Sequence, residues 1–142
     1  MAYGNKLNLE EHLAKARHNW AFLTQIEGTG LREFRDWSTI VLSYSALHLM
    51  DALLHANGRA HGESHQGRTT ALTRLVRDRR MARRSLDSYL HLALRSRSLR
   101  YSELPPRDQE LQELIIDYFR RVEAEVIERL GLEPLPAFHF ER

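Results

Sequence analysis

The sequence contains no cysteine, which excludes disulfide bonds and metal sites built from thiolates. It also contains no apolar run that approaches the ~20 residues of a membrane-spanning helix. The first residues, MAYGNKLNLEEHL, do not follow the charged-then-apolar order of a signal peptide. We therefore expect a cytoplasmic protein that has no membrane partner.

Lysine is scarce, because only two of the 21 lysine and arginine residues are lysines. The arginines concentrate in the middle of the chain, where from Arg68 to Arg100 the only acidic residues are Asp78 and Asp87. The net charge is nevertheless only +2, since the last third of the chain is rich in acids. A basic segment is typical of proteins that bind an anionic partner such as nucleic acid or a nucleotide. Solvated, arginine-rich helix faces are the alternative interpretation.

Glycine and proline are also few, with seven and four residues, and most of them separate segments with helical periodicity. These segments predict helices over residues 9–27, 31–57, 65–77, 81–101 and 107–130. We expect an all-α fold, an up-and-down bundle of four to five helices in residues 1–130, followed by a tail in residues 131–142. The tail either packs on the bundle or contacts another molecule through Phe138 and Phe140.

The segment DWSTIVLSYSALHLMDALLH, residues 36–55, is apolar on most sides and is expected to lie in the centre of the bundle. One polar stripe interrupts it, formed at helical spacing by Tyr44, His48, Asp51 and His55. A buried carboxylate needs a partner, and Arg68 is one candidate for Asp51.

Arg97 is the other candidate partner for Asp51. A metal site is the alternative for this stripe, with His48, Asp51, His55 and His65 as ligands. No matching carboxylate–histidine spacing marks a second helix, so we expect neither a metal nor another cofactor.

Two predicted helix ends carry further candidate ligand-binding residues. Ser64 is placed to cap the helix of residues 65–77, whose first turn then contains His65 and Arg68. Backbone N–H groups at such a helix start bind phosphate well, and the two side chains add donors. The helix of residues 81–101 ends with Arg95, Arg97, Arg100 and Tyr101.

The ordered set of these fragments resembles the HEPN domain, and in particular small stand-alone bacterial HEPN proteins with a YxALH…SHxxR…RY pattern. The fragments are Asp36-Trp37, Tyr44-Ser-Ala-Leu-His48, Ser64-His65-x-x-Arg68 and Ser96-Arg97-x-x-Arg100-Tyr101, within roughly residues 9–104. The resemblance implies a helical bundle, commonly a homodimer, with RNA or a nucleotide as ligand. Many relatives are metal-independent ribonucleases of toxin–antitoxin and phage-defence systems, and others are non-catalytic binding modules. An antitoxin or a nucleotidyltransferase is the partner that such a role implies.

The sequence departs from the ribonuclease members of this family at one position. Those members carry Arg, a polar residue and then a His at the end of the long helix, with four to six residues between the Arg and the His. Here Tyr101 stands in place of that His. Tyrosine side chains ionise only near pH ~10, so they are poor general bases at neutral pH.

Three functions remain open from the sequence. The first is a HEPN-like RNA- or nucleotide-binding protein with a degenerate ribonuclease motif, whose ligand contacts Tyr44, Arg68, Arg95, Arg100 and Tyr101. The second is a metal-independent ribonuclease with a rearranged centre, in which His48, His65 and Arg97 are catalytic. The third is a non-catalytic interaction or accessory subunit.

Overall fold

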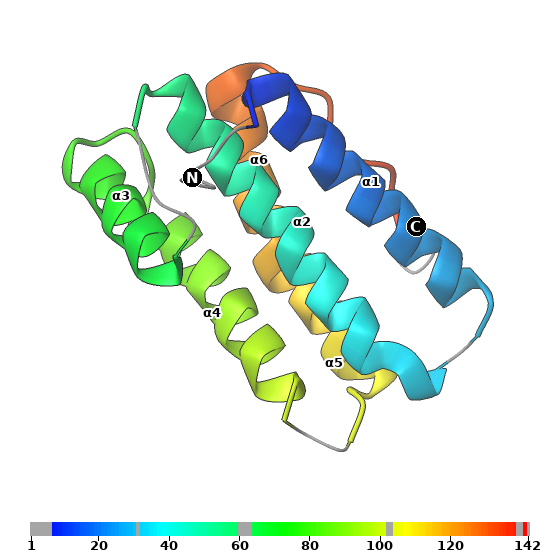
Figure 1. The fold of residues 1–142 in the computed structure, drawn as a ribbon. Helices are drawn as coiled ribbons and strands as arrows, with labels where there is room; N and C mark the ends of the chain where they lie inside the picture. The colour runs from blue at the N-terminus through cyan, green and yellow to red at the C-terminus, as the bar shows by residue number, and fades with distance from the viewer. Residues whose placement is uncertain (1–6, 31, 60–63, 102–103, 139–140, 142) are drawn as a thin grey trace.

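The described part of the chain is an all-α bundle (Figure 1), as the sequence predicts. The computed structural model describes residues 7–30, 32–59, 64–101, 104–138 and 141. Its elements in chain order are α1 (Leu9–Gly28), the 3₁₀ turn η1 (Arg32–Phe34), α2 (Arg35–Ala56), α3 (His65–Arg77), α4 (Arg83–Leu99), α5 (Asp108–Glu113), the π-helical segment η2 (Leu114–Phe119) and α6 (Arg120–Leu130). No helix in these ranges is both long and apolar enough to cross a membrane.

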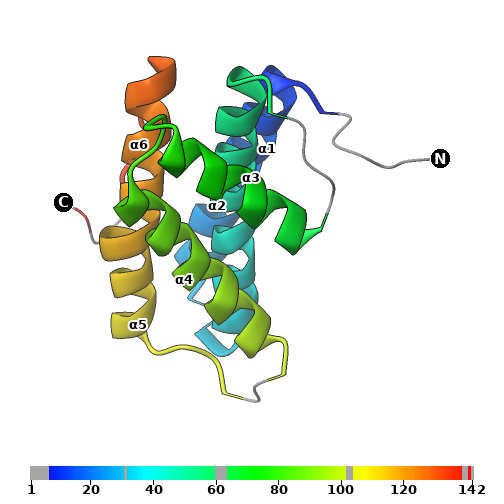
Figure 2. The same ribbon diagram turned by 90° about the vertical axis from the view of Figure 1, so that its left-hand side faces the viewer.

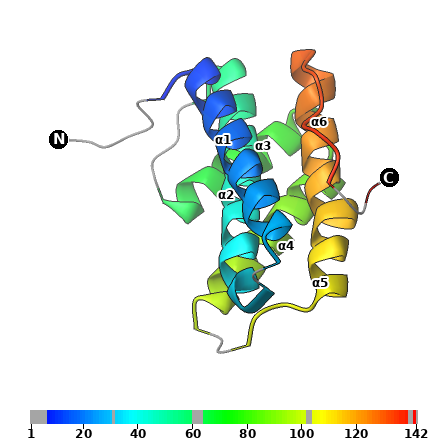
Figure 3. The same cartoon turned by 90° about the vertical axis from the view of Figure 1, so that its right-hand side faces the viewer.

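The long helices run alternately in opposite directions, so the bundle has the predicted up-and-down topology. α1 and α2 form one antiparallel pair, and α2 also packs against α4 and α6. α5, η2 and α6 follow one another as a single rod (Figure 3). The shorter α3 crosses outside α2 and α4 (Figure 2). This crossing brings the start of α3 beside α4, where the candidate site lies.

The helix ends are fixed by the residues that the sequence marks as caps. The Asn8 side chain accepts a hydrogen bond from the Glu11 backbone, and the Glu11 carboxylate accepts one from the Asn8 backbone, which completes a capping box. Ser64 Oγ accepts a hydrogen bond of 3.0 Å from the Gly67 N–H and caps α3. Gly131 ends α6 with φ of 66°, a left-handed conformation that costs little without a Cβ.

α2 is the central helix, as its all-round apolar character predicts. Its small residues Ser45 and Ala46 are fully buried and let α1 approach closely. The Ser45 hydroxyl donates a hydrogen bond of 2.8 Å to the Ala16 carbonyl of α1, so this buried polar group is satisfied. Leu53 and Leu54 are also buried, and each contributes about 1.5–3 kcal/mol relative to an exposed side chain.

The π-helical segment η2 changes which aromatic side chain of the last rod enters the core. A regular helix over residues 107–130 predicts Tyr118 on the apolar face, but Phe119 is the residue that is fully buried. A π turn contains an extra residue and rotates the following side chains around the helix axis. Phe119 therefore packs against Trp20, with ring centroids 4.9 Å apart, and Tyr118 stacks on His91 of α4.

The C-terminal tail packs on its own bundle, which is the first of the two predicted alternatives. Phe138 is 1% exposed and meets the edge of the Trp20 ring. Arg120 holds the tail through hydrogen bonds to the Pro136 carbonyl and to the Glu141 carboxylate. The prediction that Phe138 anchors another molecule is therefore wrong, because its ring is already buried. The prediction for Phe140 lies outside the described residues.

Candidate functional site

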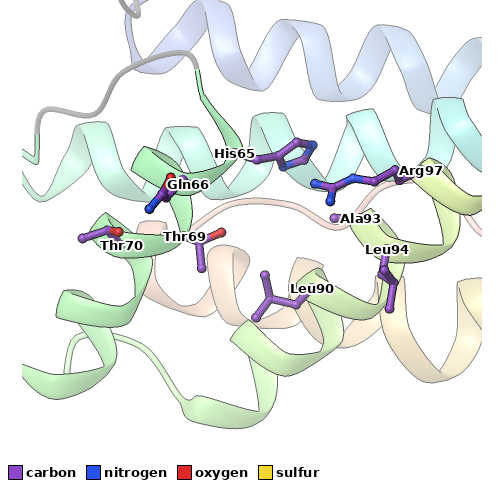
Figure 4. Close-up of a pocket in the computed structure, with 8 residues that line it drawn as sticks. All are labelled: His65, Gln66, Thr69, Thr70, Leu90, Ala93, Leu94 and Arg97. Carbon is purple, nitrogen blue, oxygen red and sulfur yellow. The ribbon is translucent and has the colours of Figure 1, made fainter.

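A groove lies between the first two turns of α3 and the second half of α4 and encloses about 480 Å³. Its floor is apolar and consists of Leu90, Ala93 and Leu94 of α4. Polar groups surround this floor, and His65 and Arg97 face each other across it (Figure 4). The remaining lining residues come from α3 and are Gln66, Thr69 and Thr70. An apolar floor with a few convergent polar groups is the usual composition of a small-ligand site.

The electrostatics of the groove are set by arginines. Partial burial lowers the pKa of His65, and the positive charges of Arg97, Arg68 and Arg100 lower it further. His65 is therefore neutral at neutral pH and offers a hydrogen-bond acceptor or a base. Within the described ranges, no carboxylate forms an ion pair with Arg97. Its guanidinium is thus available to an anionic ligand.

Tyr44 and Arg100, from α2 and the end of α4, extend this basic surface. The terminal nitrogen of Arg100 donates a hydrogen bond of 2.7 Å to the Tyr44 hydroxyl, and the guanidinium carbon lies 5.9 Å from the ring centre. Tyr101 is 85% exposed and lies just beyond α4. The tyrosine at this helix end is thus a phenol in contact with solvent, and not a buried structural residue.

Arg68 and Asp51 form a buried ion pair beneath the start of α3. Arg68 donates from Nε to one Asp51 oxygen at 2.7 Å and from a terminal nitrogen to the other at 3.1 Å. The residues are 7% and 2% exposed. The prediction that Asp51 pairs with an arginine is therefore confirmed, with Arg68 rather than Arg97. Because it is buried and paired, Arg68 supports the fold and is not a surface contact for a ligand.

Tyr89 of α4 lies beside this ion pair and is buried. Burial raises the pKa of Tyr89 to about 12, although the nearby positive charge of Arg68 acts in the opposite direction. Its hydroxyl has no hydrogen-bond partner of good geometry among the described residues. Helical spacing places Tyr89 on the apolar face of α4, but the nearby charge of Arg68 cannot be inferred from spacing on α4 alone.

His48 lies in a different environment from the one that the sequence predicts. The prediction places it against the start of α3 and the end of α4. Instead its Nδ1 lies 3.1 Å from Nδ1 of His12, a buried residue of α1. The pKa of His48 is lowered to about 4, mainly by burial and also by the positive charges of His12 and Arg68, while Asp51 acts in the opposite direction. α1 packs against α2, and the His48 ring contacts α1 at this interface.

The other predicted site residues are dispersed. Arg95 forms an ion pair with Glu110 of α5 and so lies on the α5 side of α4, outside the groove lining. His55 is exposed in the last turn of α2. Within the described ranges, the groove lining includes His65 and Arg97 from the predicted set, whereas His48 belongs to the α1–α2 interface.

The potential metal ligands differ from those that the sequence suggests. The predicted alternative combines His48 and Asp51 with His55 and His65. In the described part of the chain, the three side chains whose ligand atoms lie within 4.8 Å of one another are those of His12, His48 and Asp51. His12 was missed because it sits beside the apolar seam of α1, where a histidine is ordinarily a structural residue.

Comparison with protein-family models, with curated proteins and with solved structures finds no significant match to this chain. The function must therefore be argued from the geometry of the site.

Proposed function

We propose that this chain is a HEPN-like protein that binds RNA or a nucleotide in the groove between α3 and α4. The observation that carries the proposal is the pairing of His65 and Arg97 across this groove, in which Arg97 has no carboxylate partner among the described residues. Arg68 and Arg100 add positive potential around the groove. Two of the four sequence fragments that resemble the family contribute to this groove, through His65 and Arg97.

The groove offers a separate surface for each part of a nucleotide. Arg97 provides two parallel N–H donors that match the oxygens of a phosphate. The apolar side chains of Leu90 and Leu94 present a surface for a base or a sugar face. Gln66 and Thr69 supply an amide and a hydroxyl for hydrogen bonds to ribose or base edges. The volume of about 480 Å³ is within the range of small-ligand pockets.

Fluorescence anisotropy with a labelled single-stranded RNA oligonucleotide tests this proposal. Arg97→Ala is expected to weaken binding by about ten-fold or more, because one charge-assisted contact is lost. Arg95→Ala is the matched control, since it removes an arginine from the same helix that already pairs with Glu110. Equal losses in the two variants, or no loss in Arg97→Ala, would contradict a ligand in this groove.

Metal-independent ribonuclease activity is the second candidate, and the neutral state of His65 favours it. His65 would take the proton of a 2′-hydroxyl, whose oxygen attacks the adjacent phosphorus to form a 2′,3′-cyclic phosphate. The bond to the 5′-oxygen breaks at the same time, and that oxygen takes a proton from water and leaves as a 5′-hydroxyl. Arg97 would stabilise the charge that develops on the phosphoryl oxygens. His48 is left out of this proposed centre, because its ring lies against His12 and does not line the groove. Cleavage of RNA in EDTA that disappears in His65→Ala would support this activity, and an intact substrate with wild-type protein would exclude it.

The homodimer and the biological setting rest on the family resemblance. A toxin–antitoxin or phage-defence role, with an antitoxin or nucleotidyltransferase partner, is the setting proposed for the binding activity. A non-catalytic accessory subunit remains the alternative if neither RNA binding nor cleavage is found. Light scattering at micromolar concentration distinguishes a dimer from a monomer. A monomer would contradict the proposed homodimer.

A further inference from the structure

Three side chains that could bind a metal ion lie close together at the interface of α1 and α2, and the proposed RNA binding does not involve them. His12 comes from α1, and His48 and Asp51 follow each other by one turn on α2. None of the three lines the groove between α3 and α4. The two histidine Nδ1 atoms are 3.1 Å apart, and each residue places a ligand atom within 4.8 Å of the other two.

We propose that His12, His48 and Asp51 bind a divalent cation of the zinc, cobalt or nickel class. Two imidazole nitrogens at ~2.0–2.1 Å from a tetrahedral zinc ion lie roughly 3.3 Å apart, close to the observed separation. Two nitrogen ligands and one carboxylate oxygen select these metals over magnesium and calcium, which prefer oxygen ligands. His48 is only partly buried, so a water molecule can reach the fourth position.

The surroundings of the three ligands fit this role. Arg68 hydrogen-bonds to both Asp51 oxygens and fixes the carboxylate, as partners of metal-bound carboxylates commonly do. A carboxylate oxygen has two lone pairs, so it can accept a hydrogen bond and bind a cation at the same time. Arg68 and Lys15 are positive and oppose the cation, so micromolar rather than nanomolar affinity is expected.

Without a metal, the two histidines form one hydrogen bond in which one ring donates to the other. This arrangement satisfies one ring nitrogen on each residue. It is the alternative that the experiment has to distinguish, because it predicts no affinity for a cation. The proposal does not depend on RNA binding, since different residues carry it.

Titration of the EDTA-treated full-length protein with Co²⁺, followed by visible absorption, tests the proposal. One Co²⁺ per chain is expected, with the intense bands of tetrahedral coordination, and Zn²⁺ but not Mg²⁺ should displace it. His12→Gln and His48→Gln should each weaken binding by about ten-fold or more. His55→Gln is the matched control because it removes an exposed histidine two turns along α2, and it should bind as wild type does.

If a variant fails to fold, measurements on the wild-type protein alone still test the proposal. Zn²⁺ is expected to shift the side-chain ¹⁵N resonances of both His12 and His48 and to raise the melting temperature. No binding of Co²⁺ or Zn²⁺ below about 1 mM would overturn the site. Loss of binding in His55→Gln with retention in His12→Gln would also overturn it, because the ligands would then be different.

Discussion

Arg68 of α3 donates two hydrogen bonds to the carboxylate of Asp51 on α2, and both side chains are buried between these helices. The ion pair joins the helix that carries His65 to the centre of the bundle. It therefore fixes one side of the groove without contacting a ligand. His65 lies one turn before Arg68 on α3, so a shift of this helix would change its distance to Arg97.

Removal of one partner of this pair is predicted to destabilise the fold strongly. Arg68→Ala should lower the free energy of unfolding by about 3–5 kcal/mol, since the buried carboxylate of Asp51 loses the guanidinium that hydrogen-bonds to both of its oxygens. The double variant Asp51→Leu/Arg68→Met should lose much less, because no buried charge remains. Urea denaturation followed by circular dichroism measures both.

Arg83→Ala is the control for this prediction, because Arg83 forms an exposed ion pair with Asp87. Its free energy of unfolding should stay within about 0.5 kcal/mol of wild type. If Arg68→Ala changes stability no more than Arg83→Ala does, the pair does not hold α3 to α2.

The buried tail is predicted to contribute substantially to stability. Phe138→Ala should cost about 3–5 kcal/mol, because it leaves a cavity beside Trp20 and Phe119. Phe22→Ala, at a position that is 48% exposed, should cost far less in the same urea titration. Equal effects of the two substitutions would mean that the tail is not part of the folded core.

Stability is predicted to fall in mild acid because of His48. Its pKa is about 4 in the folded protein, whereas an unfolded histidine titrates near ~6.5. The unfolded chain therefore binds the proton first, so folding stability decreases as pH falls from about 6.5 towards 4. In EDTA, His48→Gln should lose this part of the pH dependence. Identical pH slopes for wild type and His48→Gln in denaturation experiments would contradict the assignment.

RNA affinity is predicted to increase as pH falls, through His65. In the free protein, partial burial lowers the pKa of His65. The positive charges of Arg97, Arg68 and Arg100 act in the same direction. A bound phosphate stabilises the imidazolium and raises that pKa again. Binding therefore takes up a proton at pH values between the pKa of His65 in the free protein and its pKa in the complex. The dissociation constant is expected to become smaller as pH falls through this window. Anisotropy titrations of wild type and His65→Gln measure the effect, which should vanish in the variant.

The sequence was sufficient for the features that local chemistry determines. Asn8, Ser64 and Gly131 fixed helix ends because caps depend on a few neighbouring residues. The pairing of Asp51 with an arginine followed from the cost of a buried charge. The choice of Arg68 rather than Arg97 could not be predicted in this way, since it depends on how α3 crosses α2.

The remaining features depend on packing between segments that are distant in sequence. His12 meets His48 only because α1 covers α2, a register that spacing within one helix does not determine. Arg95 and Arg97 are two residues apart and look equivalent in the sequence, yet α5 places Glu110 beside one of them. Phe119 is the fully buried aromatic residue of the last rod and Tyr118 is only partly buried, although both lie at helical spacing from Ile115, so the spacing alone does not choose between them.

Chemical-shift mapping of RNA binding tests the central claim most directly, because it locates the ligand on wild-type protein. A short RNA oligonucleotide is added to ¹⁵N-labelled protein, and the backbone amides and histidine rings are followed. The proposed groove predicts the largest changes at His65, Thr69 and the end of α4, with His48 unaffected. Largest changes on the α1 face, or no changes with RNA at millimolar concentration, would contradict it.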